Sequence, residues 1–357
     1  MKILFIAPRF SPELGGVEKH VDRVAEKLSE YGNEVTIITS TNRNDLKSFE
    51  KSNGVNIYRN YLAGSSNQSR VFLYLRLAKM MFFLLKNLTL VKSHDVIHLH
   101  DPVTFLWIVP FIPFLRKRMF ITFHGFEGYP VPKSSKIIRK IAEKYTSGNI
   151  CVGEFITKWY GTKANSIIVG GVELEKNLKD NPSEEAAVFV GRLEKDTGIM
   201  DFLDSLSILK DTFGIDLPLH ICGDGSLKSK VIQTAQDHKI TIFLHGFVEN
   251  VRTYFIKCRY AFVTGYLSIL EAMYCKRLVF SIYDNPLKRD YLYSIPETEK
   301  LMLVASSSLD LATKLSNVIK SKESAKPILE DAYAFASNQS WENVAHTYLN
   351  LYGTNLK

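Results

Sequence analysis

Several short apolar runs in this chain end at charged or polar side chains that could do chemistry. Arg192 follows the run Ala187–Gly191, and its planar guanidinium can hold a diphosphate through two parallel hydrogen bonds. His124 ends the run Met119–His124, and Glu127 lies shortly after it. Because α/β proteins bind ligands at the carboxyl ends of parallel strands, these positions are candidates for a binding site.

Two histidines alternate along one expected strand, in the run Ile97-His-Leu-His-Asp-Pro102, so both side chains point to the same face. A metal pair is conceivable, but no third ligand lies nearby in the sequence. A structural role is therefore the favoured interpretation of His98 and His100. His100 and Asp101 also stand at the carboxyl end of that strand, where they could contact a ligand.

A glycine pair opens the first helical pattern, in the run Ser11-Pro-Glu-Leu-Gly-Gly-Val-Glu-Lys-His20. Gly15 and Gly16 would let the backbone approach a ligand closely, and the free N–H groups of a helix N-terminus favour anions. The third glycine and the later acidic residue of a dinucleotide fingerprint are absent. A plain strand-to-helix turn is the alternative interpretation.

The elements that must position these residues follow a regular alternation. Short apolar runs read as buried parallel strands, and between them lie segments with apolar residues at helical spacing. The expected strands are 2–7, 34–39, 96–100, 119–124, 187–191, 218–223, 240–245, 260–263 and 278–282, and the expected helices are 17–31, 200–213, 227–237, 251–257 and 269–274. Over 357 residues, this alternation predicts two doubly wound α/β domains.

Positive charge is concentrated in the first half of the chain. Residues 1–166 contain 24 lysines and arginines and 13 acidic residues, a net charge of +11, whereas the remainder contains 21 and 24, a net charge of −3. This bias indicates an anionic partner: a membrane surface, a phospholipid-linked molecule or nucleic acid. A solvated surface with a fortuitous bias explains it equally well. Nucleic acid is the least favoured partner, because the basic residues are not interleaved with a known reading motif.

The segment Arg70–Lys92 is strongly apolar but carries Arg76, Lys79 and Lys86 in its interior, so it is not expected to span a membrane. On a helix, these three charges fall within one narrow arc. A core helix with one wet stripe is the favoured interpretation, and a helix lying at a membrane interface is the alternative. A compact basic cluster follows at residues 116–118.

The cysteines and the first residues bear on the compartment. Cys151, Cys222, Cys258 and Cys275 show no metal spacing, and their mostly apolar surroundings predict buried, reduced thiols. The first apolar run is too short for a signal peptide and reads as a strand. We therefore expect a cytoplasmic protein.

Further runs in the second half complete a pattern. They are Gly191-Arg-Leu-Glu-Lys-Asp-Thr-Gly198, Ile221-Cys-Gly-Asp-Gly-Ser-Leu227, His245-Gly-Phe-Val-Glu-Asn250, Gly265-Tyr-Leu-Ser-Ile-Leu-Glu-Ala-Met273 and Asn338-Gln-Ser-Trp-Glu-Asn-Val-Ala-His346. With the glycine pair and the His-Gly at position 124, they resemble the motifs of retaining family 4 glycosyltransferases, in the same order over almost the whole chain. The resemblance implies the GT-B fold, in which two Rossmann-like doubly wound domains face each other across a cleft.

The resemblance also implies a domain plan. Residues 1–166 would form an N-terminal acceptor-binding domain, and residues 167–335 a C-terminal domain that binds a nucleotide sugar. A helix within residues 336–357 would cross back onto the first domain, with Trp341 as its apolar anchor.

Each motif gains an implied role from the resemblance. His124 would contact the reacting sugar, Arg192 the diphosphate, and Glu271 the ribose hydroxyls, and these three are the catalytic candidates. Glu127, close to His124, could activate the acceptor. Backbone N–H groups at the start of the helix that holds Glu271 would receive phosphates. The residues implied in nucleotide binding are Gly15, Gly16, Lys195, Thr197, Gly223, Phe247, Val248, Tyr266, Leu267 and Ser268. Among them, Phe247 and Val248 would line the base pocket.

Two positions depart from the family pattern. The family has a second glutamate eight residues before Glu271, where this chain has Val263. The family has a lysine where this chain has Thr197, and Lys195 lies two residues earlier. A hydroxyl at that position would bind a phosphate without neutralising it. The residues that could supply the lost contacts to the sugar are Thr264, Asp284 and Asn285.

The implied activity is that of a retaining, hexosyltransferase-type glycosyltransferase. It would move a sugar from a UDP- or GDP-sugar to a glycan or lipid-linked acceptor in polysaccharide or glycoconjugate biosynthesis. No metal or other cofactor is expected, because no Asp-x-Asp motif is present. The basic first half would fit a cytoplasmic enzyme at the inner face of a membrane.

Three alternatives share the implied fold. A non-catalytic nucleotide-sugar-binding or scaffolding protein would explain the two departures. An epimerase would need more acid–base groups around the sugar than these motifs place there. A phosphorylase would need a cofactor lysine or a second phosphate site, and neither is evident in the sequence.

Overall fold

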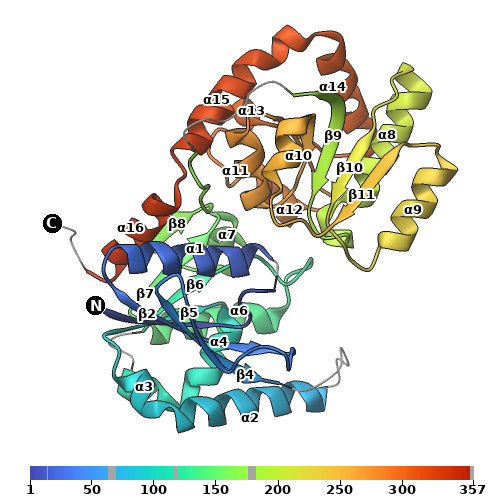
Figure 1. The fold of residues 1–357 in the computed structure, drawn as a ribbon. Helices are drawn as coiled ribbons and strands as arrows, with labels where there is room; N and C mark the ends of the chain where they lie inside the picture. The colour runs from blue at the N-terminus through green and yellow to red at the C-terminus, as the bar shows by residue number, and fades with distance from the viewer. Residues whose placement is uncertain (14, 63–69, 116–118, 176–181, 354–357) are drawn as a thin grey trace. The chain divides into compact units, whose positions relative to one another are not determined.

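The computed structural model describes residues 1–357 except 14, 63–69, 116–118, 176–181 and 354–357 (Figure 1). The chain forms two compact units. Unit 1 consists of Met1–Ile168 and Trp341–Lys357, and unit 2 of Val169–Ser340. The domain limits expected at 166 and 335 thus lie two and five residues before these boundaries. The basic cluster at 116–118 lies outside the described residues.

Unit 1 is built on an eight-stranded sheet with the order β3-β4-β2-β1-β5-β6-β7-β8. Neighbouring strands run parallel, apart from the antiparallel pair β3 and β4. The strands are β1 (Lys2–Ala7), β2 (Glu34–Thr41), β3 (Phe49–Ser52), β4 (Val55–Tyr61), β5 (Val96–His100), β6 (Met119–Phe123), β7 (Gly148–Val152) and β8 (Ser166–Ile168). The central strands are buried on both faces, as strands covered by two layers of helices must be.

Helices cover both faces of this sheet. They are α1 (Gly16–Glu30), α2 (Arg70–Lys86), α3 (Leu88–Lys92), α4 (Pro102–Ile108), η1 (Val109–Phe111), α5 (Ile112–Leu115), α6 (Lys133–Tyr145), α7 (Phe155–Tyr160) and α16 (Trp341–Leu351). Figure 1 shows α1 and α16 together on one face and α2 and α4 on the other. The last helix of the chain is therefore part of unit 1.

Unit 2 is built on a six-stranded sheet, all parallel, with the order β11-β10-β9-β12-β13-β14. Its strands are β9 (Glu184–Val190), β10 (Leu219–Cys222), β11 (Ile242–Gly246), β12 (Cys258–Phe262), β13 (Leu278–Ile282) and β14 (Leu303–Ala305). Its helices are η3 (Lys195–Thr197), α8 (Ile199–Phe213), α9 (Lys228–Asp237), α10 (Arg252–Lys257), α11 (Tyr266–Tyr274), α12 (Pro286–Leu292), α13 (Thr298–Leu301), α14 (Ser308–Lys320), η4 (Lys322–Ala325) and α15 (Lys326–Ser337). The expected doubly wound α/β architecture is thus confirmed in each unit.

The core of unit 2 is aromatic at its centre. Phe202 of α8 stacks on Phe262 of β12 with ring centroids 4.8 Å apart, and Phe189 of β9 meets Phe202 edge to face. These rings are fully buried, and each buried side chain of this size stabilises the fold by about 1.5–3 kcal/mol. The core thereby fixes β9 and β12, whose carboxyl ends carry the residues described below.

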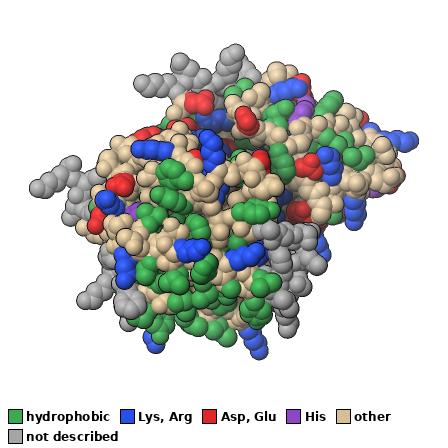
Figure 2. Space-filling view, turned by 60° about the horizontal axis from the view of Figure 1, so that its bottom comes forward, with side chains coloured by type: hydrophobic (Ala, Val, Ile, Leu, Met, Phe, Trp, Pro, Cys, Tyr) green, Lys and Arg blue, Asp and Glu red, His purple; other side chains and the backbone are tan. Residues whose placement is uncertain are grey.

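Helix α2 exposes large apolar side chains. Met80 and Leu84 are buried, but Tyr74, Leu75, Phe82 and Leu85 are each more than half exposed. Figure 2 shows hydrophobic side chains gathered over this helix with lysines and arginines at their margin. The favoured interpretation, a core helix with one wet stripe, is therefore wrong, because the exposed face is apolar as well as basic. Within the described residues, no helix is long and apolar enough to cross a membrane.

The four cysteines are all buried and free, as their surroundings predicted. Burial raises the pKa of each thiol, so none has the thiolate character of a reactive cysteine.

Candidate functional site

The strand order of unit 2 reverses between β9 and β12. From β9 the chain proceeds to β10 and β11 on one side, and it then returns through α10 to β12 on the other side of β9. The loops after β9 and β12 therefore diverge, and such a switch point is where open α/β sheets bind ligands. These two loops contain Arg192, Lys195 and Thr197 after β9, and Val263 and Thr264 after β12.

Arg192 presents an exposed positive charge at this edge. Its side chain is 57% exposed and forms a 2.8 Å ion pair with Asp196, four residues along. An exposed pair of this kind contributes only about 0–1 kcal/mol, so an incoming anion can replace Asp196 at little cost. Lys195, in the same loop, is exposed in the short helix η3.

Thr197 uses its hydroxyl internally. The hydroxyl donates towards the carbonyl oxygens of Glu194, at 2.7 Å, and Arg192, at 2.9 Å. The expectation that Thr197 would donate to a phosphate does not fit this arrangement. Its own carbonyl accepts a 3.1 Å hydrogen bond from the Thr264 hydroxyl, which ties the loop after β9 to the loop after β12.

Lys288 of α12 reaches the same place and was missed by the sequence reasoning. Its ammonium donates a 3.0 Å hydrogen bond to the Thr264 carbonyl, and the residue is only 8% exposed. Burial lowers the lysine's pKa to about 8, against a smaller opposing effect of Asp196 and Asp284. The available signal was the run Asn285-Pro-Leu-Lys288 directly after an apolar strand, which is a helix start that carries a cation.

The start of α11 offers fewer free amides than expected. The Tyr266 N–H donates to the Tyr291 hydroxyl at 3.1 Å, and the two rings stack with centroids 4.1 Å apart. The Tyr266 amide is thus occupied, and that part of the expectation is corrected. Among the described residues, no protein acceptor takes the amides of Leu267 and Ser268, so these two N–H groups remain able to bind an anion.

Both positions at which the family has a glutamate in this motif are buried. Glu271 lies on α11 about one turn beyond Ser268 and is 7% exposed. Val263 is fully buried at the end of β12. The position of the absent glutamate is therefore part of the apolar core here, and Glu271 is the carboxylate that remains.

Gly223 and Gly225 have a packing role. A β-carbon at Gly223 would lie 1.8 Å from the Gly191 carbonyl oxygen, and one at Gly225 would lie 2.5 Å from that of Leu193. The space beside these glycines is filled by the backbone of the loop after β9. Gly223 thus lets the Arg192 loop pack closely, and its implied role in nucleotide binding stays a prediction.

Phe247 and Val248 follow the carboxyl end of β11, the outermost strand. Phe247 is 57% exposed, and Val248 is half-buried. Gly246 before them has a φ of +65°, a left-handed turn that suits glycine and redirects the chain. An exposed aromatic ring at the ligand edge of the sheet is a suitable surface for a base to stack on.

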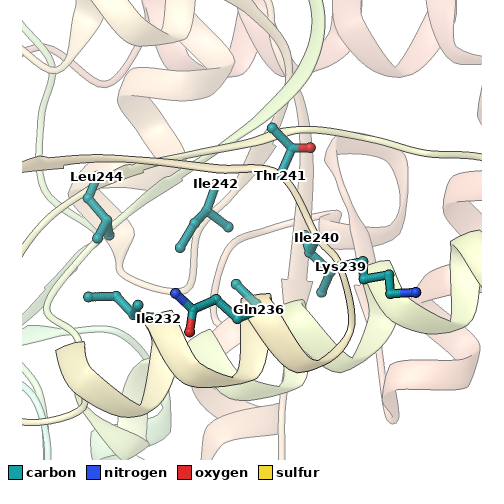
Figure 3. Close-up of a pocket in the computed structure, with 8 residues that line it drawn as sticks. Ile232, Gln236, Lys239, Ile240, Thr241, Ile242 and Leu244 are labelled. Atoms are coloured by element: carbon teal, nitrogen blue, oxygen red, sulfur yellow. The ribbon is translucent and has the colours of Figure 1, made fainter.

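A hollow of about 450 Å³ lies elsewhere on this unit, between α9 and β11 (Figure 3). Ile232 and Gln236 of α9 point across it towards Ile242 and Leu244 of β11. It is lined by none of the expected site residues. The hollow is therefore separate from the switch-point chemistry.

Asp284 and Asn285 were expected to replace lost sugar contacts. The Asn285 side-chain oxygen caps α12 by accepting from the Lys288 N–H at 2.9 Å, and its amide nitrogen donates to Asp284 at 2.7 Å. Asn285 is thus committed to the start of α12. Asp284 is exposed and stays a candidate.

The sheet of unit 1 also has a switch point, between β1 and β5. The glycine pair follows β1. A β-carbon at Gly15 would lie 2.1 Å from a Glu18 carboxylate oxygen, whereas one at Gly16 would meet no atom within 4 Å. Gly16 therefore faces open space, as a residue that a ligand approaches should.

The carboxyl ends of β5 and β6 bring two expected residues together. The rings of His100 and His124 are joined by a 3.1 Å hydrogen bond between Nδ1 and Nε2, and both side chains are buried. The Nδ1 of His124 has no hydrogen-bond partner among the described residues, so this atom can meet a ligand. Burial lowers the pKa of both rings well below the usual value, and both are neutral at pH 7.

Asp101 stands beside this pair in a strained backbone conformation, with φ of 70° and ψ of 154°. One carboxylate oxygen accepts a 2.9 Å hydrogen bond from the His124 N–H. Burial raises the pKa of this carboxyl to about 7.

Helix α16 completes the polar cluster. The Tyr348 hydroxyl lies 2.9 Å from His20 Nε2 and 2.8 Å from the Thr122 hydroxyl. His98 is bonded through both ring nitrogens, to Thr122 at 2.7 Å and to the Tyr352 hydroxyl at 2.8 Å. The structural role favoured for His98 is confirmed. Within the described residues, no group of three or more His, Cys, Asp or Glu side chains could hold a metal ion.

Glu127 is occupied on both oxygens. Arg139 donates to one at 3.0 Å, and the Tyr160 hydroxyl donates to the other. Arg139 also donates to the carbonyls of His124 and Gly125, so the three residues brace the loop after β6. This bracing leaves Glu127 poorly placed to activate an acceptor.

Comparison with solved structures identifies the fold. Sucrose-phosphate synthase from Thermosynechococcus elongatus superposes with a TM-score of 0.80 at 16% identity, covering 99% of this chain and 98% of that one. HepE from Anabaena, solved in complex with UDP, gives a TM-score of 0.70 at 14% identity over 98% and 99% of the two chains. The architecture is that of the GT-B glycosyltransferases.

Sequence comparison identifies the family. A Campylobacter jejuni enzyme is 23% identical over 266 residues, which are 71% of this chain and 73% of the relative. It is named GalNAc-alpha-(1->4)-GalNAc-alpha-(1->3)-diNAcBac-PP-undecaprenol alpha-1,4-N-acetyl-D-galactosaminyltransferase. The model of Glycosyltransferase Family 4 matches residues 14–174, and that of Glycosyl transferases group 1 matches residues 163–335. With these two models joined over almost its whole length, the chain belongs to the group 1 glycosyltransferases, with a family 4 N-terminal half.

Proposed function

We propose that this glycosyltransferase transfers a sugar, with retention, from a UDP- or GDP-sugar to a glycan or lipid-linked acceptor. The observation that carries the donor assignment is the set of anion-binding groups at the switch point of unit 2. Arg192 is exposed there in a weak ion pair, and the amides of Leu267 and Ser268 have no protein acceptor among the described residues. HepE, which has a similar fold, is solved in complex with UDP, and this supports a nucleotide ligand for the proposed donor.

The remaining donor contacts follow from the same edge. Glu271 would bind the ribose hydroxyls through its carboxylate. Phe247 and Val248 would contact the base, and Asp284 is the exposed carboxylate left to orient the sugar. His124 lies in unit 1, and we propose separately that its Nδ1 contacts a sugar there.

The transfer itself needs no covalent enzyme intermediate. The acceptor hydroxyl oxygen attacks the anomeric carbon on the face that the diphosphate leaves. The bond from that carbon to the phosphate oxygen breaks with its electron pair on the oxygen, and the acceptor proton moves to the same departing oxygen. Arg192 and the amides of Leu267 and Ser268 stabilise the charge that develops there. We propose that this is done without a metal, so a chelator should leave turnover unchanged.

We place the acceptor at unit 1 and propose peripheral contact with an anionic membrane through α2. The name of the similar Campylobacter jejuni enzyme contains a saccharide linked to PP-undecaprenol. Helix α2 exposes Tyr74, Leu75, Phe82 and Leu85, with Lys79 and Lys86 on the same helix. Such a face combines apolar insertion with attraction to anionic headgroups.

Calorimetric titration with a panel of nucleotide sugars, paired with detection of nucleoside diphosphate release, tests the donor assignment. We expect one donor to bind and to be slowly hydrolysed, and Glu271→Ala to weaken that binding. Binding without turnover, even with membrane extract, would favour the non-catalytic alternative. Absence of binding by every donor would contradict the donor site.

Sedimentation with lipid vesicles tests the membrane contact. We expect the protein to bind vesicles that contain phosphatidylglycerol more than pure phosphatidylcholine vesicles, and Phe82→Ser to reduce this binding several-fold. Leu309→Ser on α14 is the matched control, because Leu309 and Phe82 are both 57% exposed. Equal binding by both variants and the wild type would contradict the assignment to α2.

A further inference from the structure

We infer that Lys288 is a phosphate-binding residue that positions the donor diphosphate together with Arg192. The inference rests on the proposed donor site and adds to it a cation from a third element, α12. Lys288 lies in the run Tyr283–Asp290, of which the sequence reasoning singled out Asp284 and Asn285 but not the lysine.

The position of the ammonium carries the inference. Lys288 Nζ donates to the carbonyl of Thr264, in the loop after β12. The hydroxyl of Thr264 donates in turn to the carbonyl of Thr197, in the loop after β9. The ammonium is therefore anchored where the two loops of the switch point meet, in the part of the sheet edge where an anionic ligand is expected.

Charges of both signs face Lys288. Asp196 and Asp284 attract the ammonium from the loop after β9 and the end of β13, and Arg192 repels it. The ring of Tyr291 lies 4.5 Å from the ammonium and adds a cation–π contact. Asp196 is also the ion-pair partner of Arg192, so one carboxylate serves two cations.

A purely structural role explains the residue less well. A neutral hydrogen-bond donor would hold the Thr264 carbonyl without the cost of burying an ammonium. The start of α12 is also held in place by a cap and by packing. Asn285 caps α12 at the Lys288 N–H, and Leu287 beside it is fully buried. A pre-positioned cation of this kind binds phosphate without a further ordering cost.

In the loop after β9, the residue linked to Lys288 through Thr264 is the uncharged Thr197. Thr197 lies one hydrogen bond from Thr264 and two from Lys288. A lysine introduced at Thr197 would therefore bring a second cation to the same edge from another element. A double variant can therefore move the positive charge from position 288 to position 197 and keep the net charge unchanged.

The test compares binding of UDP and GDP, and of their nucleosides, to the wild type, Lys288→Met and the double variant Thr197→Lys/Lys288→Met. We expect Lys288→Met to weaken binding of the diphosphate about 10- to 100-fold, since a hydrogen bond to a charged group is lost. Binding of the nucleoside should change less than about twofold. The double variant should recover most of the diphosphate affinity. Lys300→Met is the control, because Lys300 is exposed and pairs with Glu297 across one turn.

A pH series on the wild type tests the same inference without a variant that must fold. Diphosphate binding should weaken between about pH 7 and pH 9, because the free lysine loses its proton with a pKa of about 8 while the bound lysine must keep it. Unchanged diphosphate affinity in Lys288→Met, or equal loss for nucleoside and diphosphate, would overturn the role of Lys288 and leave the donor site standing. Failure of the wild type to bind either diphosphate would overturn both.

Discussion

A β-carbon on Gly223 would lie 1.8 Å from the carbonyl oxygen of Gly191. The atom in the way is backbone, so it cannot move aside as the end of a flexible side chain would. The absence of a side chain at Gly223 is thus what lets the loop that carries Arg192 lie against the loop after β10.

Replacement by alanine should affect stability differently at Gly223 of unit 2 and at Gly16 of unit 1. We expect Gly223→Ala to lower the free energy of unfolding by about 2–4 kcal/mol, because the Arg192 loop must be displaced. Gly16→Ala should leave that free energy unchanged or raise it by about 0.4–1 kcal/mol, since nothing lies within 4 Å of the new atom. Urea denaturation of both variants measures the difference. Equal stability of the two would contradict the close packing at Gly223.

Arg192→Gln should weaken binding of the nucleoside diphosphate about 10- to 100-fold, because a charged, forked donor is lost. Its stability should change by less than about 1 kcal/mol, since the pair with Asp196 is exposed. Arg259→Gln is a matched control on β12: it breaks an exposed pair with Glu185 and should not alter binding. Calorimetry with UDP and GDP measures the affinity. An unchanged affinity in Arg192→Gln would argue against diphosphate binding by Arg192.

Restoring a glutamate at position 263 should harm the protein. Val263 is fully buried, so Val263→Glu places a carboxylate in the apolar core and should cost about 3–5 kcal/mol of stability. Val263→Gln separates size from charge and should cost less. A stable Val263→Glu variant with faster turnover would show instead that this position reaches the donor sugar.

Asp101→Asn should make stability less dependent on pH. The folded pKa of about 7 lies above the ordinary value of 3.8, so the native protein binds more protons between these values and loses stability as pH rises through them. Asparagine removes this loss, tolerates a positive φ better than most residues, and can still accept from the His124 N–H. The variant's advantage in urea denaturation should therefore grow from about pH 4 to pH 7 and then level off. Because the buried histidines are the same in both proteins, a pH-independent difference would contradict the raised pKa.

Tyr348→Phe should lower the free energy of unfolding by about 1–3 kcal/mol, since His20 and Thr122 would lose a buried partner. Tyr74→Phe on α2 is the control, because Tyr74 is 67% exposed. A loss equal to that of the control would mean that the hydroxyl network does not hold α16 in place.

Periodicity was sufficient to predict much of the fold. Strands such as β1 and β5 are mostly apolar runs because helices cover both of their faces. The hydropathy of the sequence therefore indicates their burial. The short β3 was missed because it is mostly exposed at the sheet edge and carries no apolar pattern. Helix α2 was misjudged for a related reason: hydropathy reports which residues are apolar, and it cannot report whether another element covers them.

The same distinction, between local patterns and contacts made on folding, applies to the site residues. Arg192 was found because an arginine after a strand is a local signal. Lys288 was missed because its position depends on a contact with Thr264, 24 residues earlier, which no local pattern encodes. Likewise, the Tyr266 N–H donates to the Tyr291 hydroxyl only because two helices pack together. A helix start recognised in a sequence therefore suggests more free N–H groups for an anion than the folded protein has.

The placement of α16 in unit 1 sets an order of events during synthesis. Unit 2 is one continuous stretch, residues 169–340, and all of it leaves the ribosome before Trp341 does. Unit 1 is made from both sides of that stretch, so the histidines around His20 wait for Tyr348 until the whole of unit 2 has been translated. The half of the protein that is made first is therefore the half that finishes folding last.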